Sequence, residues 1–286
     1  MRNNEERFGA SIAQQSADIP QQLQSLEQDK QEAAPLSFIV PTEFVALPSK
    51  GKFYPAHHPL YGKDSVEIKQ MTAKEEDILS SRNLLKKGIA LDKLIQSLVM
   101  NKKIDTDSLT VEDRNAIIVA ARISAYGNEY LTMATCPSCG DKNKHKFDLL
   151  EKLESVETTD EVEVDNQGSF TVTLPATKWN VKCRALNGYD EKTMMRLSEA
   201  KKNSSGGDSL LLEQIKMTVV TINGVDDRQM IAEAIDAMPA RDSKYLRSFY
   251  QDAVKGIDMR HTFSCKSCDY QGELEVPLTA DFFWFK

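Results

Sequence analysis

Two Cys-x-x-Cys pairs constrain this 286-residue chain more than any other feature of its sequence. The pairs are Cys136 with Cys139 and Cys265 with Cys268, and each lies between alternating runs that are typical of strands. A Cys-x-x-Cys turn brings two thiolates to one metal ion, and two such turns complete a shell of four. We therefore predict one tetrahedral zinc site per chain. Because four thiolates leave no position open for water or substrate, we expect this zinc to be structural.

The cysteines allow other interpretations than a zinc site. A single Cys-x-x-Cys pair would also fit a redox site, but two pairs in matching contexts favour a metal. His145 and His261 lie near the pairs and raise the question of a mixed shell, although four available thiolates make either histidine unnecessary as a ligand. Cys183 stands in an alternating strand, where we predict a buried apolar residue.

The overall charge and hydropathy exclude several classes of protein. The formal net charge is -7 and the pI is about 5.3, so the chain as a whole has no basic field that would gather phosphate backbones. The sequence has no apolar run of the roughly 20 residues that a membrane-spanning helix needs, and it begins with a charged stretch. We expect folding in a reducing cytoplasm, where paired cysteines bind metal and do not form disulfides.

The cysteine pairs also end two similar stretches of sequence. We interpret their common register as an internal duplication. The predicted fold class is α+β, with duplicated helix-plus-strand repeats joined by a shared zinc-ribbon-like site of four cysteines. The following pairs share an offset of 129 positions: Leu109 and Met238, Asp113 and Asp242, Gly127 and Gly256, Cys136 and Cys265, and Cys139 and Cys268.

This register divides the chain into four predicted segments. Residues 1–37 are a flexible N-terminal arm, because they are rich in Gln, Glu, Ser and Asp and poor in large apolar side chains. Residues 38–150 are the first repeat, residues 151–180 a β-hairpin connection, and residues 181–286 the second repeat with an aromatic tail. The arm is either a free tail or a segment that orders along a neighbouring subunit through Ile19, Leu23 and Leu26.

Each repeat is predicted to open with a short strand and a capped helix. Thr72 precedes Glu75 by three residues, and Asn187 precedes Asp190 in the same way, as in a capping box. The second repeat is longer, and we place its extra residues in the loop 203–208. Two later helices carry core-facing stripes at helical spacing: Ile117, Ala120, Ala121 and Ser124 in the first, and Leu246, Phe249, Tyr250 and Val254 in the second.

Recognisable catalytic patterns are missing from the sequence. It has no Gly-rich phosphate loop, no His-Glu-x-x-His helix and no Gly-x-Ser-x-Gly elbow, so we predict that the protein is not an enzyme. Lys142, Lys144 and Lys146 beside the first pair could contact phosphate. Acidic residues occupy the corresponding place beside the second pair, which weakens any continuous basic surface.

The C-terminal aromatic run is a candidate partner-binding segment. Four consecutive aromatic residues cannot all be buried on one side of a strand. They either pack on their own domain or fill a groove in a partner, and the residues concerned are Phe282, Phe283, Trp284 and Phe285.

Three segments carry a resemblance to a known family. In order along the chain they are LPSKGKFYP (residues 47–55), MTAKEEDILSS (residues 71–81) and TCPSCG (residues 135–140). This sequence resembles the baseplate hub proteins of T-even-type, contractile-tailed bacteriophages. The resemblance covers residues 41–150 well and the second repeat more loosely, and it brings no catalytic residues with it.

The resemblance implies a structural or assembly component of the tail baseplate, in the hub region. It implies other baseplate and tail proteins as partners. The charge, hydropathy and missing motifs described above predict no membrane or small-molecule partner and disfavour nucleic acid. The expected location is the tail baseplate of the virion, after assembly in the host cytoplasm. Two alternatives remain open at this stage: a zinc-ribbon adaptor or nucleic-acid-binding factor, and a tail assembly chaperone that is absent from the mature virion.

Overall fold

The computed structural model describes residues 40–154, 162–202 and 210–284. Within them the chain is a mixed α+β protein whose sheets are small and antiparallel. The predicted arm 1–37, the predicted loop 203–208 and Phe285 lie outside the described residues.

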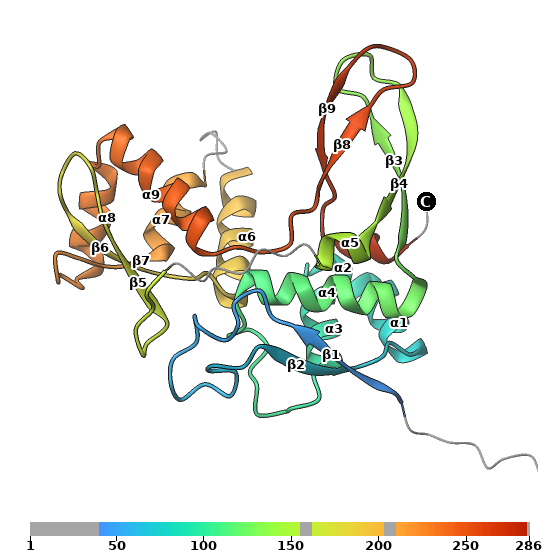
Figure 1. The fold of residues 1–286 in the computed structure, drawn as a ribbon, viewed down its shortest axis with the longest axis horizontal. Coiled ribbons are helices and arrows are strands. Elements are labelled where there is room, and N and C mark those ends of the chain that lie inside the picture. Colours follow the sequence, from blue (N-terminus) through green and yellow to red (C-terminus); the bar gives the residue numbers. More distant parts are fainter. Residues whose placement is uncertain (1–39, 155–161, 203–209, 285–286) are drawn as a thin grey trace, which may run out of the picture. The chain divides into compact units, whose positions relative to one another are not determined.

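The first half starts with a two-stranded sheet and ends with a long hairpin (Figure 1). Val45 faces Val66 across the first pair of strands, and Tyr130 faces Phe147 across the hairpin. The elements in order are β1 (Thr42–Ala46), β2 (Ser65–Lys69), α1 (Ala73–Ser80), α2 (Arg82–Lys86), α3 (Ala90–Leu98), α4 (Val111–Tyr126), β3 (Glu129–Thr135), β4 (Lys142–Asp148) and α5 (Leu149–Glu154).

The second half has a three-stranded sheet in the order β5-β6-β7 and again ends with a hairpin, β8-β9. Its helix α8 follows β7, and a short 3-10 helix, η1, comes last. The elements in order are β5 (Ser169–Thr173), β6 (Asn180–Arg184), α6 (Gly188–Lys202), α7 (Leu211–Thr218), β7 (Val219–Ile222), α8 (Arg228–Asp236), α9 (Ala240–Ala253), β8 (Arg260–Ser264), β9 (Gln271–Glu275) and η1 (Ala280–Phe283).

The capping residues predicted from the sequence lie at the starts of α1 and α6. A carboxylate oxygen of Glu75 accepts a hydrogen bond from the Thr72 N–H at 3.0 Å. Asp190 likewise accepts from the Asn187 N–H at 3.0 Å, and the Asn187 side chain accepts from the Asp190 N–H at 3.2 Å. These bonds satisfy amides that an uncapped helix would leave without partners, so both helices begin where the sequence predicts.

Two apolar cores form, and the C-terminus belongs to the first of them. The first core contains side chains of β1, β2, α1, α3 and α4, together with Phe282 and Phe283 of η1. The second contains side chains of β5, β6, β7, α8 and α9. The last described residues therefore return to the first half of the chain and complete its core.

Asp113, in the first turn of α4, fixes the loop that follows β1. Its carboxylate accepts hydrogen bonds from the Ser49 N–H at 3.0 Å, the Ser49 hydroxyl at 2.6 Å and the Tyr54 hydroxyl at 2.6 Å. The carboxyl group is fully buried, and this burial raises its pKa. Ser49 and Tyr54 belong to LPSKGKFYP, so this segment supplies the hydrogen-bond donors for one buried acid.

Asp242, in the first turn of α9, makes a matching set of contacts. It accepts from the Ala176 N–H at 2.7 Å, the Thr177 N–H at 2.9 Å and the Thr177 hydroxyl at 2.7 Å. Both acids thus hold a turn that follows a Leu-Pro dipeptide, residues 47–48 and 174–175. Each turn also contains a lysine in the left-handed region, Lys50 with φ 48° and Lys178 with φ 60°.

Replacing Asp113 by alanine should destabilise the protein. The change removes the acceptor of two hydroxyls and one amide in a buried site, so we expect a loss of about 3 kcal/mol in the free energy of unfolding. Urea denaturation followed by circular dichroism measures it. Asp77→Ala on the exposed side of α1 is the control and should change stability by less than about 0.5 kcal/mol. Equal effects of the two changes would contradict the role given to Asp113.

Candidate metal centre

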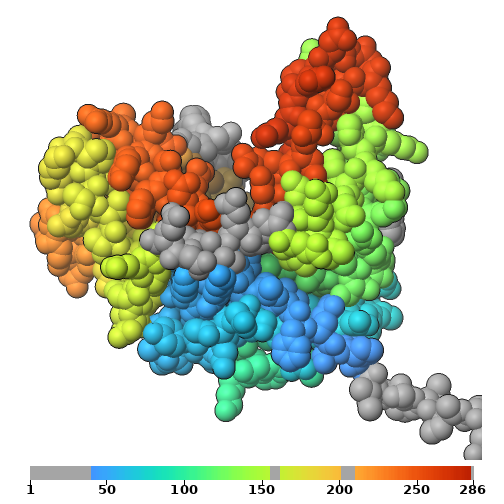
Figure 2. All heavy atoms as spheres, viewed as in Figure 1, coloured from blue at the N-terminus to red at the C-terminus, as the bar shows by residue number. Residues whose placement is uncertain are grey.

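The two hairpins bring the four predicted cysteines together. Cys136 and Cys139 lie in the turn between β3 and β4, and Cys265 and Cys268 lie in the turn between β8 and β9. Figures 1 and 2 show the hairpins side by side, with the β8-β9 hairpin in red against the β3-β4 hairpin in green. The four sulfur atoms all lie within 4.8 Å of one another.

The spacing of the sulfur atoms suits a tetrahedral metal ion. Cys136 Sγ is 3.7 Å from Cys268 Sγ, and Cys139 Sγ is 3.6 Å from Cys265 Sγ. A tetrahedron with metal–sulfur bonds of about 2.3 Å has edges of about 3.8 Å. Each of these short edges joins one hairpin to the other, so the site is completed only when both hairpins are in place.

Backbone hydrogen bonds shape both turns. The Cys136 N–H donates to the Asp141 carbonyl at 2.8 Å, and the Gly140 N–H donates to the Cys136 carbonyl at 3.0 Å. Gly140 has φ 74°, a conformation that a residue with a side chain rarely adopts. In the second turn the Cys265 N–H donates to the Tyr270 carbonyl at 3.0 Å. The chain therefore closes each turn with its own backbone and leaves the thiols free to point at one centre.

The electrostatic environment differs among the four thiols. The backbone N–H of Ser267, 3.4 Å from Cys265 Sγ, lowers the pKa of Cys265 to about 7. The Asp141 amide acts in the same direction on Cys139, but burial and the three neighbouring thiols outweigh it and raise the pKa of Cys139 to about 12. Four thiols at this spacing cannot all ionise without a cation, so metal binding would release protons.

Aromatic rings hold the hairpins together beside the cysteines. Phe263 of β8 is buried against Cys136 and Cys265. Its ring centroid lies 4.6 Å from that of His145 of β4, and the ring of Phe147 stacks on that of His261 at 3.9 Å. The two hairpins thus share a small apolar cluster beside the thiols.

The structure separates the histidines from the thiol cluster. Within the described residues the group that could hold a metal contains the four cysteines and neither His145 nor His261. Both rings lie among aromatic neighbours, and burial lowers the pKa of His261, which favours its neutral form. The fifth cysteine, Cys183, is fully buried in β6 as predicted, and burial raises its pKa to about 12.

Asn143 is a residue of the site that the sequence argument missed. Its side chain is buried and its amide group donates toward Cys265 Sγ at 3.5 Å. The alternating pattern of β4 could have identified Asn143. Side chains alternate along a strand, so the lysines at 142, 144 and 146 are exposed and the residues between them point inward. An inward amide next to a Cys-x-x-Cys turn is a natural neighbour for a thiolate.

The predicted partner-binding aromatic residues divide into three kinds. Phe282 and Phe283 are 1% and 0% exposed and fill the first core, so the structure favours packing on their own chain for these two rings. Trp284 is partly exposed and lines a groove with Leu131 and Met133 of β3. Phe285 lies outside the described residues.

Comparisons with known proteins add one finding. A family model described as T4 bacteriophage base plate protein matches residues 40–284. Comparisons with curated proteins and with solved structures gave no match. Separately, no helix in residues 40–154, 162–202 or 210–284 is long and apolar enough to cross a membrane.

Removing a cysteine from either hairpin should abolish metal binding to the same extent. Cys136→Ser and Cys265→Ser each leave three thiols, so elemental analysis of the purified variants should show loss of the metal, and their unfolding midpoints should fall by similar amounts. Cys183→Ser is the control and should retain one ion per chain. Two ions per wild-type chain would contradict a single site shared by the hairpins.

Proposed function

We propose that this chain, which belongs to the T4 bacteriophage base plate protein family, is a non-enzymatic structural component of the hub region of a contractile-tail baseplate. The observation that carries the proposal is the extent of the family match, residues 40–284, which includes both cores and both hairpins. The family is one of phage baseplate proteins, so the location is the tail of the virion and other baseplate proteins are its partners. Assembly takes place in the host cytoplasm.

The metal in this proposal is one structural zinc ion per chain. Four thiolates at tetrahedral spacing are a donor set that zinc favours, and they leave no coordination position for a reacting molecule. Two ligands come from each hairpin, and the cysteines they join are far apart in sequence. The ion would therefore hold the C-terminal hairpin on the first half of the chain.

Several contacts support the proposal that the chain is an internal duplication. The Asp113 and Asp242 contacts, the caps of α1 and α6, and the two cysteine hairpins recur in the same order. Ile68 of β2 bridges to Val99 after α3, and Cys183 of β6 pairs with Val219 after α7. The second copy was predicted to begin at residue 181, but β5, inside the predicted connection 151–180, pairs with β6, so on this proposal the copy begins at β5. Helix α8 then supplies part of its extra length in addition to the loop 203–208.

Trp284 and its groove are the proposed partner contact at the C-terminus. Leu131 and Met133 are 45% and 40% exposed, which is high for apolar side chains that lie next to one another on one face of a strand. Together with Trp284 they form an apolar surface beside the buried η1 helix. A neighbouring subunit would cover this surface in the assembled baseplate.

Mass spectrometry of purified virions tests the proposed function directly. We expect peptides of this chain in intact virions and in isolated baseplates, and chemical cross-links to hub proteins. A chain found in assembly intermediates but missing from virions would identify an assembly chaperone instead. Cross-links confined to the periphery of the baseplate would contradict the hub location.

Changing the exposed apolar surface should impair incorporation without unfolding the protein. In Met133→Glu combined with Trp284→Ala, we expect normal metal content and circular dichroism but a clear reduction in the amount of chain per baseplate. Lys103→Glu, at an exposed position outside both hairpins, is the control for a charge change. Normal incorporation of the double variant would remove this surface from the list of contacts.

A further inference from the structure

A basic groove lies among β2, α1, α2 and α3, away from the cysteine hairpins. It encloses about 570 Å³ and is open to solvent. Four of the residues that line it are lysines, and none is acidic: Lys69, Lys74, Lys93 and Lys102. Such a concentration of one charge is unexpected in a chain whose net charge is -7.

The acidic residues near this groove are largely engaged elsewhere. Residues 69–103 contain eight lysines and arginines against four acidic residues. Glu75 is buried and accepts from Lys69 and Ser97. Glu76 accepts from Tyr126, and Asp92 pairs with Arg114. Asp77 is the fourth acid and is exposed on α1. Glu75 neutralises Lys69, and the other three lining lysines leave the groove with a net positive charge.

The four lysines have different local roles. Lys69 is held by Glu75 at 2.6 Å, and the Lys102 ammonium group donates to the carbonyls of Gln96 and Val99 at the end of α3. These two lysines stabilise the fold. Lys74 and Lys93 are exposed, and Lys93 contacts only a neighbouring side chain of its own helix, Gln96, at 2.9 Å. Lys74 and Lys93 are therefore the lysines of this groove that are exposed to pair with an acidic ligand.

The groove also has an apolar component. Ile78 of α1 and Leu84 of α2 are partly exposed, and Met100 after α3 is 42% exposed. A phosphate backbone has no apolar groups to bury against these side chains, whereas an amphipathic helix presents carboxylates beside leucines. The combination of charge and apolar surface therefore favours an acidic polypeptide over a nucleic acid.

We propose that the groove lined by Lys74, Lys93 and Met100 is a docking site for an acidic amphipathic segment of another baseplate subunit. The carboxylates of that segment pair with the lysines at the rim, and its apolar side chains cover Ile78, Leu84 and Met100. This inference rests on the proposed function for the identity of the partner as a baseplate protein, but the chemistry of the groove stands without it.

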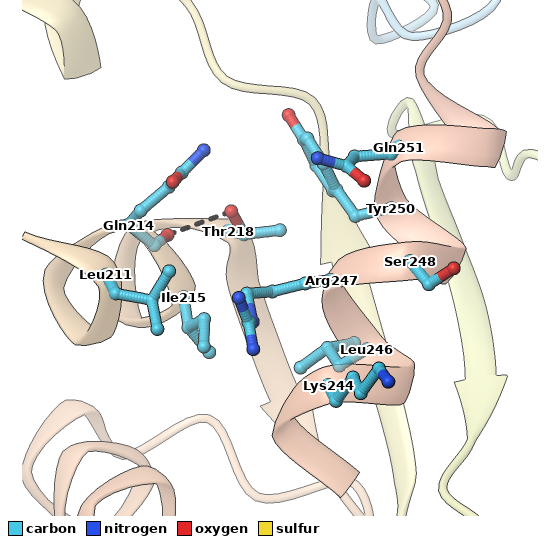
Figure 3. A pocket seen from close by; sticks show the side chains of 10 residues that line it. All are labelled: Leu211, Gln214, Ile215, Thr218, Lys244, Leu246, Arg247, Ser248, Tyr250 and Gln251. Carbon is cyan, nitrogen blue, oxygen red and sulfur yellow. Dashed lines mark hydrogen bonds between the residues drawn. The ribbon is translucent and has the colours of Figure 1, made fainter. Parts of the chain in front are cut away.

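A second groove between α7 and α9 provides a matched comparison (Figure 3). It encloses about 420 Å³, and Lys244 and Arg247 are its basic residues. Figure 3 shows Arg247 reaching from α9 toward Ile215 and Thr218 of α7, so its own side chain occupies part of the space. Most of the other side chains around it are polar or buried, which makes it a poorer site for an apolar segment.

Fluorescence anisotropy with a labelled peptide of Glu, Ala and Leu in amphipathic order tests the proposal on the full, metal-loaded chain. We expect binding at low salt that weakens as the salt concentration rises. Lys74→Glu with Lys93→Glu should weaken binding by at least about tenfold, because two favourable charge contacts become repulsive. Lys244→Glu with Arg247→Glu makes a similar charge change in the second groove and should leave binding within about twofold.

Four results would overturn the proposal: no binding of the peptide by the wild-type chain, equal loss in the two double variants, unchanged binding by Lys74→Glu with Lys93→Glu, or tighter binding of duplex DNA that the same variant abolishes.

The double variant Lys74→Glu with Lys93→Glu is also introduced into the phage, where it should enter baseplates poorly. Absence of the wild-type chain from baseplates would refute the proposed function while leaving peptide binding as the separate measure of the groove.

Discussion

The four thiols of the paired hairpins are the interaction on which the arrangement of this protein depends. Cys136 and Cys139 lie in the first half of the chain, and Cys265 and Cys268 close to its end, yet their sulfur atoms lie within 4.8 Å. The Phe263 and Phe147 rings pack between the same hairpins. Because the β8-β9 hairpin precedes η1, fixing it to the β3-β4 hairpin also brings Phe282 and Phe283 to the first core. A local cluster of four cysteines thus has consequences for long-range packing.

Buried carboxylates organise the rest of each half. Asp113 and Asp242 both stand in the first turn of a long helix, where the amide ends of the helix favour negative charge, and both accept hydrogen bonds from a turn after a Leu-Pro dipeptide. Each acid therefore ties a helix to the loop beside a sheet. Because each half uses a buried aspartate in this way, each small sheet has a loop that is fixed by hydrogen bonds to a neighbouring helix.

Two exposed surfaces of the protein combine basic and apolar side chains. On the β3-β4 hairpin, Lys144 and Lys146 lie directly across from Met133 and Leu131, and the groove of α1 to α3 combines lysines with Met100 and Leu84. A component that contacts several different neighbours in a baseplate would need such separate surfaces. The paired hairpins and the buried acids stabilise the framework, and the exposed surfaces are available to bind neighbours.

The sequence alone determined the two Cys-x-x-Cys pairs, the capped starts of α1 and α6, the core stripes of the long helices and the buried state of Cys183, because each depends on spacing within a few residues. It missed Asn143 as a neighbour of Cys265, and it left open where Phe282 and Phe283 pack. It also could not reveal that Ser49 and Tyr54 donate hydrogen bonds to Asp113, or that Lys74 and Lys93 line the same groove. These features depend on contacts between residues far apart in the chain, and only the tertiary structure decides which distant side chains meet.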